Sequence, residues 1–304
     1  MDGVLVVDKP AGITSHDVVN RARRLLGQRA VGHLGTLDPA ATGVLPLVLG
    51  RMTRLQQFYL GAEKAYEGTI RFGYATDTYD AEGEPLGPRQ ELKATLEQLR
   101  HLAVEFRGRI QQMPPAFSAK KINGVPAYKL ARRNREVELK PVEVEIKEFE
   151  LLDLDGGVAS FRARVSSGTY MRSVAHELGK RSGCGAHLAS LRRTAVGEFS
   201  IADAHTLEEV ETAASKREAE DLFVHPRKLL PGLPSVTATD EDAARIRVGR
   251  TVNLPELSRA RQVKVFQGQS HLIAIATRVA GTLFHPKIVL APDTASDYAG
   301  TQHH

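Results

Sequence analysis

The sequence predicts an α+β fold, with a mixed and largely antiparallel sheet flanked by helices. Two observations lead to this prediction. Apolar and charged residues alternate over residues 142–146 and 161–165, which is the pattern of strands that are buried on one face. Elsewhere apolar residues recur at helical spacing, in segments that are separate from these strands. Strands of antiparallel type together with separate helices are typical of the α+β class.

The N-terminal segment predicts a strand followed by a capped helix. Residues 4–7 form a short, unbroken apolar run, which indicates a buried strand. Thr14 and Asp17 have the spacing of a capping box, in which two side chains bond the free amides at a helix start. The apolar residues of 18–26 then fall on one helical face, and Gly27 closes the helix.

The rest of the chain continues this mixed pattern. We expect strands at residues 44–49 and 66–74, and helices at residues 92–106 and 171–178. The proline-rich stretch 226–234 indicates a boundary between two units.

Beyond that boundary we expect a small unit rich in β-structure. A short helical segment at residues 243–248 precedes apolar runs at 263–266, 272–275 and 288–290. Short strands in so few residues indicate a small barrel or sandwich.

The composition is that of a folded, soluble protein. The 304 residues include 41 Lys and Arg against 36 Asp and Glu, so the net charge is +5. This mild excess fits a polyanionic partner without requiring one. The single cysteine, Cys184, excludes an intrachain disulfide and a multi-cysteine zinc site, and it fits a reducing cytoplasm. No apolar stretch approaches the ~20 residues of a membrane-spanning helix, so we expect a cytoplasmic protein.

The strongest local signal is a glycine-rich loop that carries one carboxylate. Gly32, Gly35 and Gly43 allow tight turns and a close approach of backbone to ligand. Asp38 lies within this loop directly before Pro39, which restricts its backbone to extended conformations. The loop therefore presents a carboxylate at a fixed angle. The alternative is a turn aspartate that bonds its own backbone.

This loop is one of several motifs that occur together. In chain order they read GVLVVDKP at 3–10, HLGTLDPAATG at 33–43, TDTYDAEG at 76–83, PPAFSAKK at 114–121, SGTYMRS at 167–173 and LRRT at 191–194. Over residues 3–200 the chain thereby resembles the TruB family, the tRNA pseudouridine-55 synthases. The resemblance implies a pseudouridine synthase core over residues 1–232 and a PUA-like RNA-binding β domain over residues 236–304.

The resemblance also implies the reaction and its main groups. A uridine in the T-loop of tRNA is everted and isomerised to pseudouridine, without metal or cofactor, and the catalytic residues are Asp38, Tyr66 and Arg172. A carboxylate suits this chemistry as nucleophile or base at the ribose, provided that it is ionised. The Arg172 guanidinium favours the ionised form through its opposite charge. Tyr66 offers a ring that stacks on uracil and a hydroxyl for the C5 proton.

Further residues are implied in binding the substrate. They are His33, Tyr66, Tyr170, Leu191, Asp80, Lys9, Lys120, Lys121 and Arg132. Taken singly, the tyrosines and Leu191 would be interpreted as core residues, His33 as an ordinary loop residue, and Asp80 as part of a solvated acidic turn.

A basic segment, residues 107–140, indicates contact with RNA. It holds nine Lys and Arg residues against Glu136 and Glu138, with Phe117 and Tyr128 among them. A charge run by itself is usually a solvated face, but beside these motifs it predicts an RNA-gripping flap. Together with this segment, the resemblance implies tRNA, held by its T-arm, as the partner of a monomeric protein.

Other functions lack their motifs or need more residues. His176 and Glu177 begin a zinc-protease motif, but Lys180 stands where the second histidine ligand is required. A nucleoside-cleaving glycosidase would need a second carboxylic acid, for which Asp80 is the candidate. Two alternatives remain open: a synthase acting on another RNA, and an RNA-binding or tRNA-folding protein without catalysis.

Overall fold

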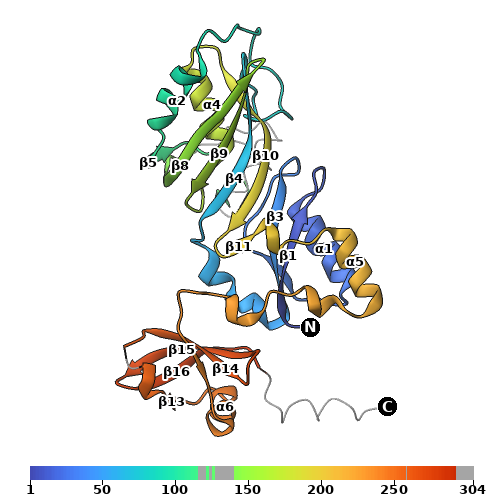
Figure 1. Ribbon diagram of the computed structural model, residues 1–304, viewed down its shortest axis with the longest axis vertical. Helices are drawn as coiled ribbons and strands as arrows, with labels where there is room; N and C mark the ends of the chain where they lie inside the picture. The colour runs from blue at the N-terminus through green and yellow to red at the C-terminus, as the bar shows by residue number, and fades with distance from the viewer. Residues whose placement is uncertain (116–120, 123–124, 127–139, 258, 292–304) are drawn as a thin grey trace.

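A long twisted sheet forms the frame of the larger part of the molecule (Figure 1). The computed structural model describes residues 1–115, 121–122, 125–126, 140–257 and 259–291. Within these residues the main sheet has the strand order β1-β3-β10-β4-β9-β8-β5, with β2 paired to β3 and β11 paired to β10. The strands are β1 (Gly3–Lys9), β2 (Val31–His33), β3 (Thr42–Leu49), β4 (Lys64–Phe72), β5 (Gly108–Gln112), β8 (Val142–Asp155), β9 (Val158–Val165), β10 (Ala186–Val196) and β11 (Phe199–Ser200).

The pairing within this sheet confirms the mixed, largely antiparallel prediction. Every described neighbouring pair is antiparallel except β3 with β10, which run parallel where Thr42 and Gly43 meet Arg192 and Arg193. This short parallel junction lies directly after the Asp38 loop. It therefore joins the N-terminal strands to the middle of the sheet at the predicted site.

Helices cover the sheet in two separate groups (Figure 1). At one end, α2 (Leu96–Val104) and α4 (Met171–Arg181) pack on β4, β8, β9 and β10 around buried residues such as Phe149 and Phe161. At the other end, α1 (Ser15–Leu25) and α5 (Leu207–Lys216) pack against β1 and β3. Short 3₁₀ segments follow or link these elements at Gly50–Tyr59, Ile201–Asp203, Ala219–Leu222, Pro226–Lys228 and Pro255–Leu257.

The ends of these helices follow from local capping chemistry. The predicted capping box of Thr14 and Asp17 is present at the start of α1. The helix predicted over residues 92–106 is shorter, because Thr95 and Gln98 form a capping box that begins α2 at Leu96. The flanking apolar residues at 92 and 106 still pack on the same core, which explains why their spacing looked helical.

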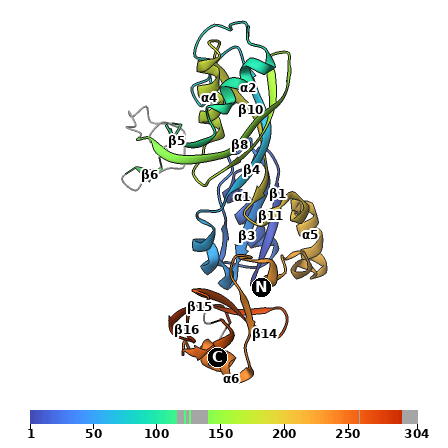
Figure 2. The same ribbon diagram turned by 60° about the vertical axis from the view of Figure 1, so that its left-hand side comes forward.

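A second, five-stranded sheet lies at the far end of the molecule from α2 and α4 (Figure 2). It has the order β12-β14-β15-β16-β13 and is covered by α6 (Asp240–Arg247). Its strands are β12 (Ser235–Thr237), β13 (Val252–Asn253), β14 (Gln262–Gln267), β15 (His271–Ala280) and β16 (Leu283–Val289), while a separate hairpin pairs β6 (Lys121–Ile122) with β7 (Val125–Pro126). The short strands predicted near the C-terminus are thus confirmed.

Apolar and polar contacts join the second sheet to the first unit. Phe266, Leu272 and Ile275 belong to the same buried cluster as Val4 and Val6 of β1. In addition, the buried ammonium of Lys264 donates to the carbonyls of Arg227 (3.1 Å) and Leu229 (2.6 Å) in the connecting segment. The two units therefore share part of one core.

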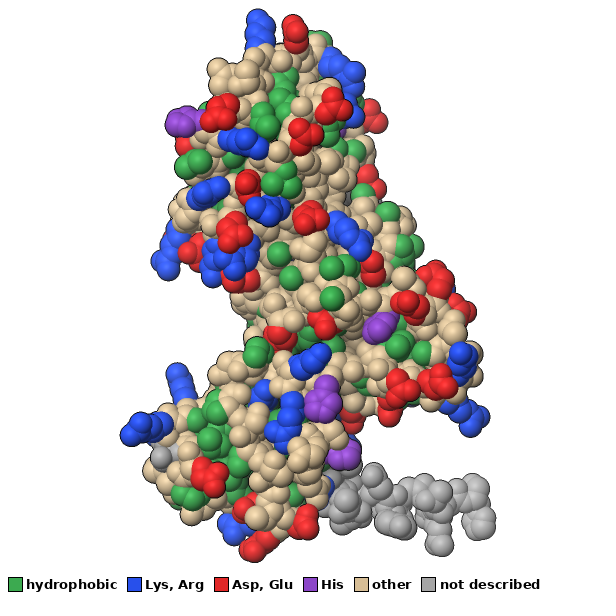
Figure 3. Space-filling view, viewed as in Figure 1, with side chains coloured by type: hydrophobic (Ala, Val, Ile, Leu, Met, Phe, Trp, Pro, Cys, Tyr) green, Lys and Arg blue, Asp and Glu red, His purple; other side chains and the backbone are tan. Residues whose placement is uncertain are grey.

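The exposed face of the main sheet carries charges of both signs. Arg162 and Arg164 of β9 pair with Glu150 (2.7 Å) and Glu148 (2.6 Å) of β8 across the strands. In the space-filling view, blue and red side chains are interspersed over this region (Figure 3). Of the helices in the described part of the chain, none combines the length and apolar character that crossing a bilayer requires.

Candidate active site

Asp38 lies on the loop between β2 and β3, and the residues on both sides of it are fixed. Leu37 and Ala41 are buried in the apolar cluster that also contains the buried side of α4. The amide of Leu37 donates to Oγ of Ser15 (2.8 Å), and the amide of Ala41 donates to the Asp38 carbonyl (3.1 Å). The Asp38 side chain itself is 46% exposed. The loop therefore holds its backbone while leaving the carboxylate accessible.

Gly43 allows the loop to pass directly into the parallel junction. Its φ is +102°, and a Cβ at this position would lie 2.1 Å from the carbonyl oxygen of Arg193. Only glycine accepts this backbone conformation and this approach without strain. The last glycine of the predicted loop is thus explained by strand packing.

Lys9 holds the Asp38 loop through backbone carbonyls. Its side chain is fully buried, and its ammonium donates to the carbonyls of Pro10 (2.8 Å), Pro39 (3.0 Å) and Ala41 (2.7 Å). Burial lowers the pKa of Lys9 to about 8, although Asp38 opposes this shift. The sequence predicted Lys9 as a substrate-binding residue. The structure instead places its three donors on backbone carbonyls around Asp38, where it positions the loop.

Arg193 holds the loop from the other side, and the sequence did not single it out. It is 1% exposed, and its guanidinium donates to the carbonyls of Val44 (2.8 Å), Thr36 (3.2 Å) and Gly35 (3.0 Å). One signal was available. Arg193 lies two residues after Leu191 in a strand, so the two side chains share a face, and Leu191 packs against the core.

Replacing Lys9 by Met is expected to destabilise the fold by about 3 kcal/mol, because three backbone carbonyls, the buried one of Ala41 among them, lose their donor while the side-chain volume is kept. Urea unfolding followed by circular dichroism at pH 7 measures this difference. Lys93→Met is the matched control, since Lys93 is exposed and should change stability by less than about 0.5 kcal/mol. Equal effects of the two changes would contradict the supporting role of Lys9.

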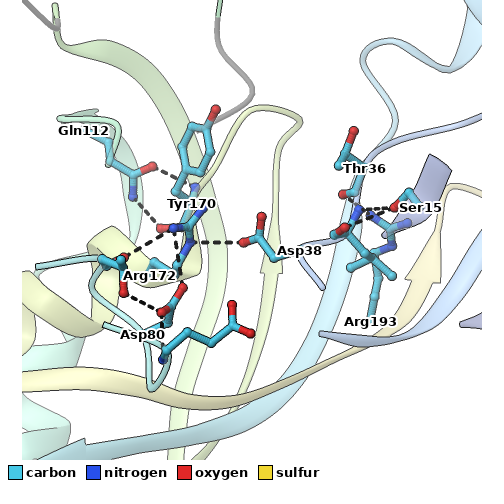
Figure 4. A network of polar contacts seen from close by, with 11 residues as sticks. Ser15, Thr36, Asp38, Asp80, Gln112, Tyr170, Arg172 and Arg193 are labelled. Carbon is cyan, nitrogen blue, oxygen red and sulfur yellow. Dashed lines mark hydrogen bonds and ion pairs between the residues drawn. The ribbon is translucent and has the colours of Figure 1, made fainter. Parts of the chain in front are cut away.

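Arg172 faces Asp38 from the first turn of α4 (Figure 4). Its Nε lies 3.0 Å from Oδ2 of Asp38, and its side chain is 6% exposed. Its Nη1 donates to the carbonyl of Thr78 (3.2 Å) and lies 3.4 Å from Oδ2 of Asp80. The structure therefore brings together three of the predicted site residues, Asp38, Arg172 and Asp80.

Asp80 is occupied by partners from its own turn as well as by Arg172. Its Oδ1 accepts hydrogen bonds from the hydroxyl of Thr78 (2.5 Å) and the amide of Glu82 (3.1 Å). Both oxygens of Asp80 are thus engaged by groups of the protein, which argues against its use as the second acid of a glycosidase.

The pKa of Asp38 is the result of opposing effects. Desolvation of the partly buried carboxyl raises it above the ordinary value, while the Arg172 guanidinium lowers it, Asp80 raises it and Lys9 lowers it. The net direction is upward. The carboxyl is thus less acidic than an aspartate in water, and Arg172 is the main group that keeps it ionised.

The first turn of α4 is anchored to the end of β5. The side-chain amide of Gln112 accepts from the Tyr170 amide (2.8 Å) and donates to the Tyr170 carbonyl (3.1 Å). One turn on, the hydroxyl of Ser173 donates to the Met113 carbonyl (2.8 Å). These bonds fix the backbone on both sides of Arg172, and Tyr170 lies half-buried beside it (Figure 4).

Tyr66 and Leu191 lie on the strands next to the loop. Tyr66 in β4 is 8% exposed and stands opposite Arg193, and burial raises the pKa of its hydroxyl while Arg193 lowers it. Leu191 stands opposite Gly68 in the same strand pair and is only partly buried. Both residues thus share a sheet face with the arginine that holds the loop.

His33 is the last residue of β2, directly before the loop. Its Nδ1 accepts a hydrogen bond from the Gly35 amide (3.3 Å), and burial lowers the pKa of the ring. Of the predicted flap residues, Lys120 and Arg132 lie outside the described residues, as does the side chain of Lys121. Over the described part of the chain, no group of three or more His, Cys, Asp and Glu side chains is arranged to hold a metal ion.

Two protein-family models match the chain. The N-terminal domain of the TruB family pseudouridylate synthases matches residues 23–171, and the tRNA pseudouridylate synthase B C-terminal domain matches residues 172–231. Two curated relatives carry the name tRNA pseudouridine synthase B. The protein of Solibacter usitatus (strain Ellin6076) is 51% identical, and that of Aquifex aeolicus (strain VF5) is 40% identical. Each match covers 95% of this chain and 100% of the relative.

Solved structures are also similar to nearly the whole chain. A crystal structure of a Cbf5–Nop10–Gar1 complex matches with a TM-score of 0.71 and 26% identity, over 96% of this chain and 85% of that chain. An H/ACA RNP bound to a substrate RNA containing 2′-deoxyuridine matches with a TM-score of 0.70 and 25% identity, over 96% and 86% of the two chains.

Proposed function

Because the chain belongs to the TruB family of pseudouridylate synthases, we propose that it converts the uridine at position 55 in the T-loop of tRNA to pseudouridine. The observation that carries this proposal is the Asp38 carboxylate, which is accessible on a rigid loop and lies 3.0 Å from the Arg172 guanidinium. The names of the relatives at 51% and 40% identity support tRNA as the substrate class.

The reaction is an isomerisation that needs one ionised carboxylate. The bond from C1′ to N1 of uracil breaks, the base turns, and a bond from C1′ to C5 forms; the C5 proton leaves and N1 gains a proton. Asp38 acts on the ribose as nucleophile or as base while the uracil is detached. Lys9, Arg193 and Arg172 do not react; they fix the loop and keep its carboxylate charged.

The target base must leave the RNA stack to reach Asp38. Eversion costs a few kcal/mol, which contacts in the pocket offset. Tyr66 supplies a ring for the everted uracil and a hydroxyl for the C5 proton, with Leu191 and Tyr170 as further walls. His33 lies at the loop entrance, near the space that the base leaves.

RNA affinity is divided between two further regions. We propose that residues 107–140 grip the T-arm, and that residues 236–304 form a PUA-like RNA-binding domain beside the catalytic domain of residues 1–232. The second sheet with its own apolar cluster supports this division. The protein acts as a cytoplasmic monomer.

Hydrogen exchange of the intact protein tests whether both regions bind RNA, because bound tRNA should protect amides in residues 107–140 and in residues 236–304. Protection of residues 107–140 alone would reject RNA binding by residues 236–304.

The activity is tested with an unmodified tRNA transcript and no added cofactor, by mapping pseudouridine at every uridine. We expect a single product at position 55. A transcript with cytidine at that position should bind equally well and yield nothing. Product only at another uridine, or only in another RNA, would reject the T-loop assignment. Binding without product at any uridine would leave an RNA-binding or tRNA-folding protein.

A further inference from the structure

Tyr79 and His176 stack on each other beside the Arg172–Asp38 pair. Their ring centroids are 3.7 Å apart and their planes are inclined by 17°. His176 lies on α4 four residues after Arg172, so both side chains leave the same face of the helix. Tyr79 lies between Thr78 and Asp80, the two residues of the acidic turn that contact Arg172. Helix and turn therefore meet at two adjacent points, one polar and one aromatic.

The backbone of Tyr79 adopts a conformation that its side chain does not favour. Its φ is +65°, in the left-handed region where glycine and asparagine are common and a bulky aromatic residue is strained. Surrounding bonds hold it there. Its amide donates to the Thr76 carbonyl (3.3 Å), and its carbonyl accepts from the Leu188 amide of β10 (2.9 Å). Strain of this kind persists only where the surrounding structure over-determines it, and it is concentrated at functional sites.

His176 contributes its flat face to this contact. Its Nδ1 is buried and has no hydrogen-bond partner among the described residues. Because Nδ1 bonds none of the described residues, hydrogen bonding through this atom does not explain the placement of the ring. Buried polar atoms without partners are rare and costly, so another contact must hold the ring in this place. Burial also lowers the pKa of His176, with Lys180 adding to the shift and Glu177 opposing it, so the ring is neutral near pH 7.

We propose that the Tyr79–His176 stack is a positioning contact, which holds the acidic turn against α4 so that Arg172 keeps its alignment with Asp38. Without the stack the strained turn relaxes, and the Thr78 carbonyl and Asp80 carboxylate, now 3.2 Å and 3.4 Å from Nη1, withdraw. The guanidinium then gains freedom, and its contact with Asp38 loosens. This inference rests on the proposed function, because it gives a purpose to the arginine–aspartate pair.

The test compares variants that remove a ring with variants that keep it. Tyr79→Asn accepts the left-handed backbone without a ring, and His176→Leu fills the space without a flat face. Tyr79→Phe and His176→Phe retain the stack. With saturating transcript, we expect the single-turnover rate constant of the ring-removing variants to fall about 10- to 100-fold, as for small displacements at a reacting centre. The ring-keeping variants should retain the wild-type rate, and Kd should change in none of the four.

Two further readouts separate positioning from simple stabilisation. The acid limb of the rate profile should move to higher pH in the ring-removing variants, because a loosened Arg172 favours ionised Asp38 less. Withdrawal of Asp80 acts in the opposite direction, but its influence on the pKa of Asp38 is smaller than that of Arg172, and Lys9 stays in place. The double variant should be no slower than the slower single variant, because both changes break one contact. Folded ring-removing variants with the wild-type rate and acid limb would overturn the proposal. If one such variant fails to fold, the other decides.

Failure of this inference is distinguishable from failure of the proposed function. If the wild-type protein forms no pseudouridine, the proposed function itself is rejected. If the wild-type protein is active and the ring-removing variants are equally active, the proposed function stands and only the positioning role of the stack is rejected.

Discussion

Replacing Asp38 by Asn is expected to abolish pseudouridine formation while leaving tRNA binding intact. The amide has the shape of the carboxyl group, but it is neutral and cannot attack the ribose or accept its proton. The single-turnover rate constant should fall by at least about 10⁴-fold, as when a group at the reacting centre is replaced by its neutral isostere. Product mapping with pre-bound transcript measures the rate, and filter binding measures Kd. Substantial remaining turnover would reject the role of Asp38.

The same variant should be as stable as the wild-type protein or more stable at pH 7. The folded state raises the pKa of Asp38, mainly through burial, so the folded protein binds this proton more tightly than the unfolded chain. By linkage, the stability that this group contributes is present below its ordinary pKa and is lost as the pH rises through its folded pKa. The ionised form needed for catalysis thus costs stability, and Asn removes that cost. Urea unfolding at pH 7 checks the sign; a clearly less stable variant would contradict it.

Replacing Arg172 by Met is expected to give the second largest loss, about 10²- to 10³-fold in the single-turnover rate at pH 7. Arg172 is the strongest influence that lowers the pKa of Asp38. Without it that pKa rises further, and a smaller fraction of the carboxyl is ionised at a given pH. The deficit should therefore be larger at pH 6 than at pH 9, where ionisation is recovered.

Two comparisons make this result specific. Arg172→Lys keeps the charge without the planar fork, so its acid limb should lie between those of the wild type and the Met variant. Arg162→Met changes an exposed arginine that pairs with Glu150 on the outer sheet face, and it should leave the rate unchanged. A deficit of the Met variant that is the same at every pH would show that Arg172 acts by other means than keeping Asp38 charged.

Much of the fold was predictable because local chemistry determines it. The capping box of Thr14 and Asp17 begins a helix whatever lies around it, and alternation along residues 142–146 and 161–165 identifies strands buried on one face. The extent of α2 was less predictable. Apolar spacing continued past both helix ends, because the flanking residues bury the same face without helical backbone.

For the candidate site, the sequence predicted which residues come together better than it predicted what holds them in place. The glycine-rich loop and its motifs led to Asp38, with Arg172 and Asp80 nearby. Sequence shows that Lys9 is basic, but not that three carbonyls enclose its ammonium. For Arg193 the shared face with Leu191 signals burial, but not the carbonyls that it holds, because these lie 149 to 158 residues earlier in the chain. The stack of Tyr79 on His176 depends on a left-handed turn that residue type argues against.

The parallel junction of β3 with β10 also bears on when a growing polypeptide gains activity. Thr36 and Arg193, whose guanidinium holds the Thr36 carbonyl, are 157 residues apart in the chain. Arg172 also lies far beyond Asp38 in the sequence. Contacts so distant in sequence form only after both partners have left the ribosome. A nascent protein that has not yet released β10 carries Asp38 without Arg193, whose guanidinium holds the carbonyls of Gly35 and Thr36 in the same loop. Truncated translation products that end before this strand are therefore expected to form no pseudouridine, however well their first helix folds.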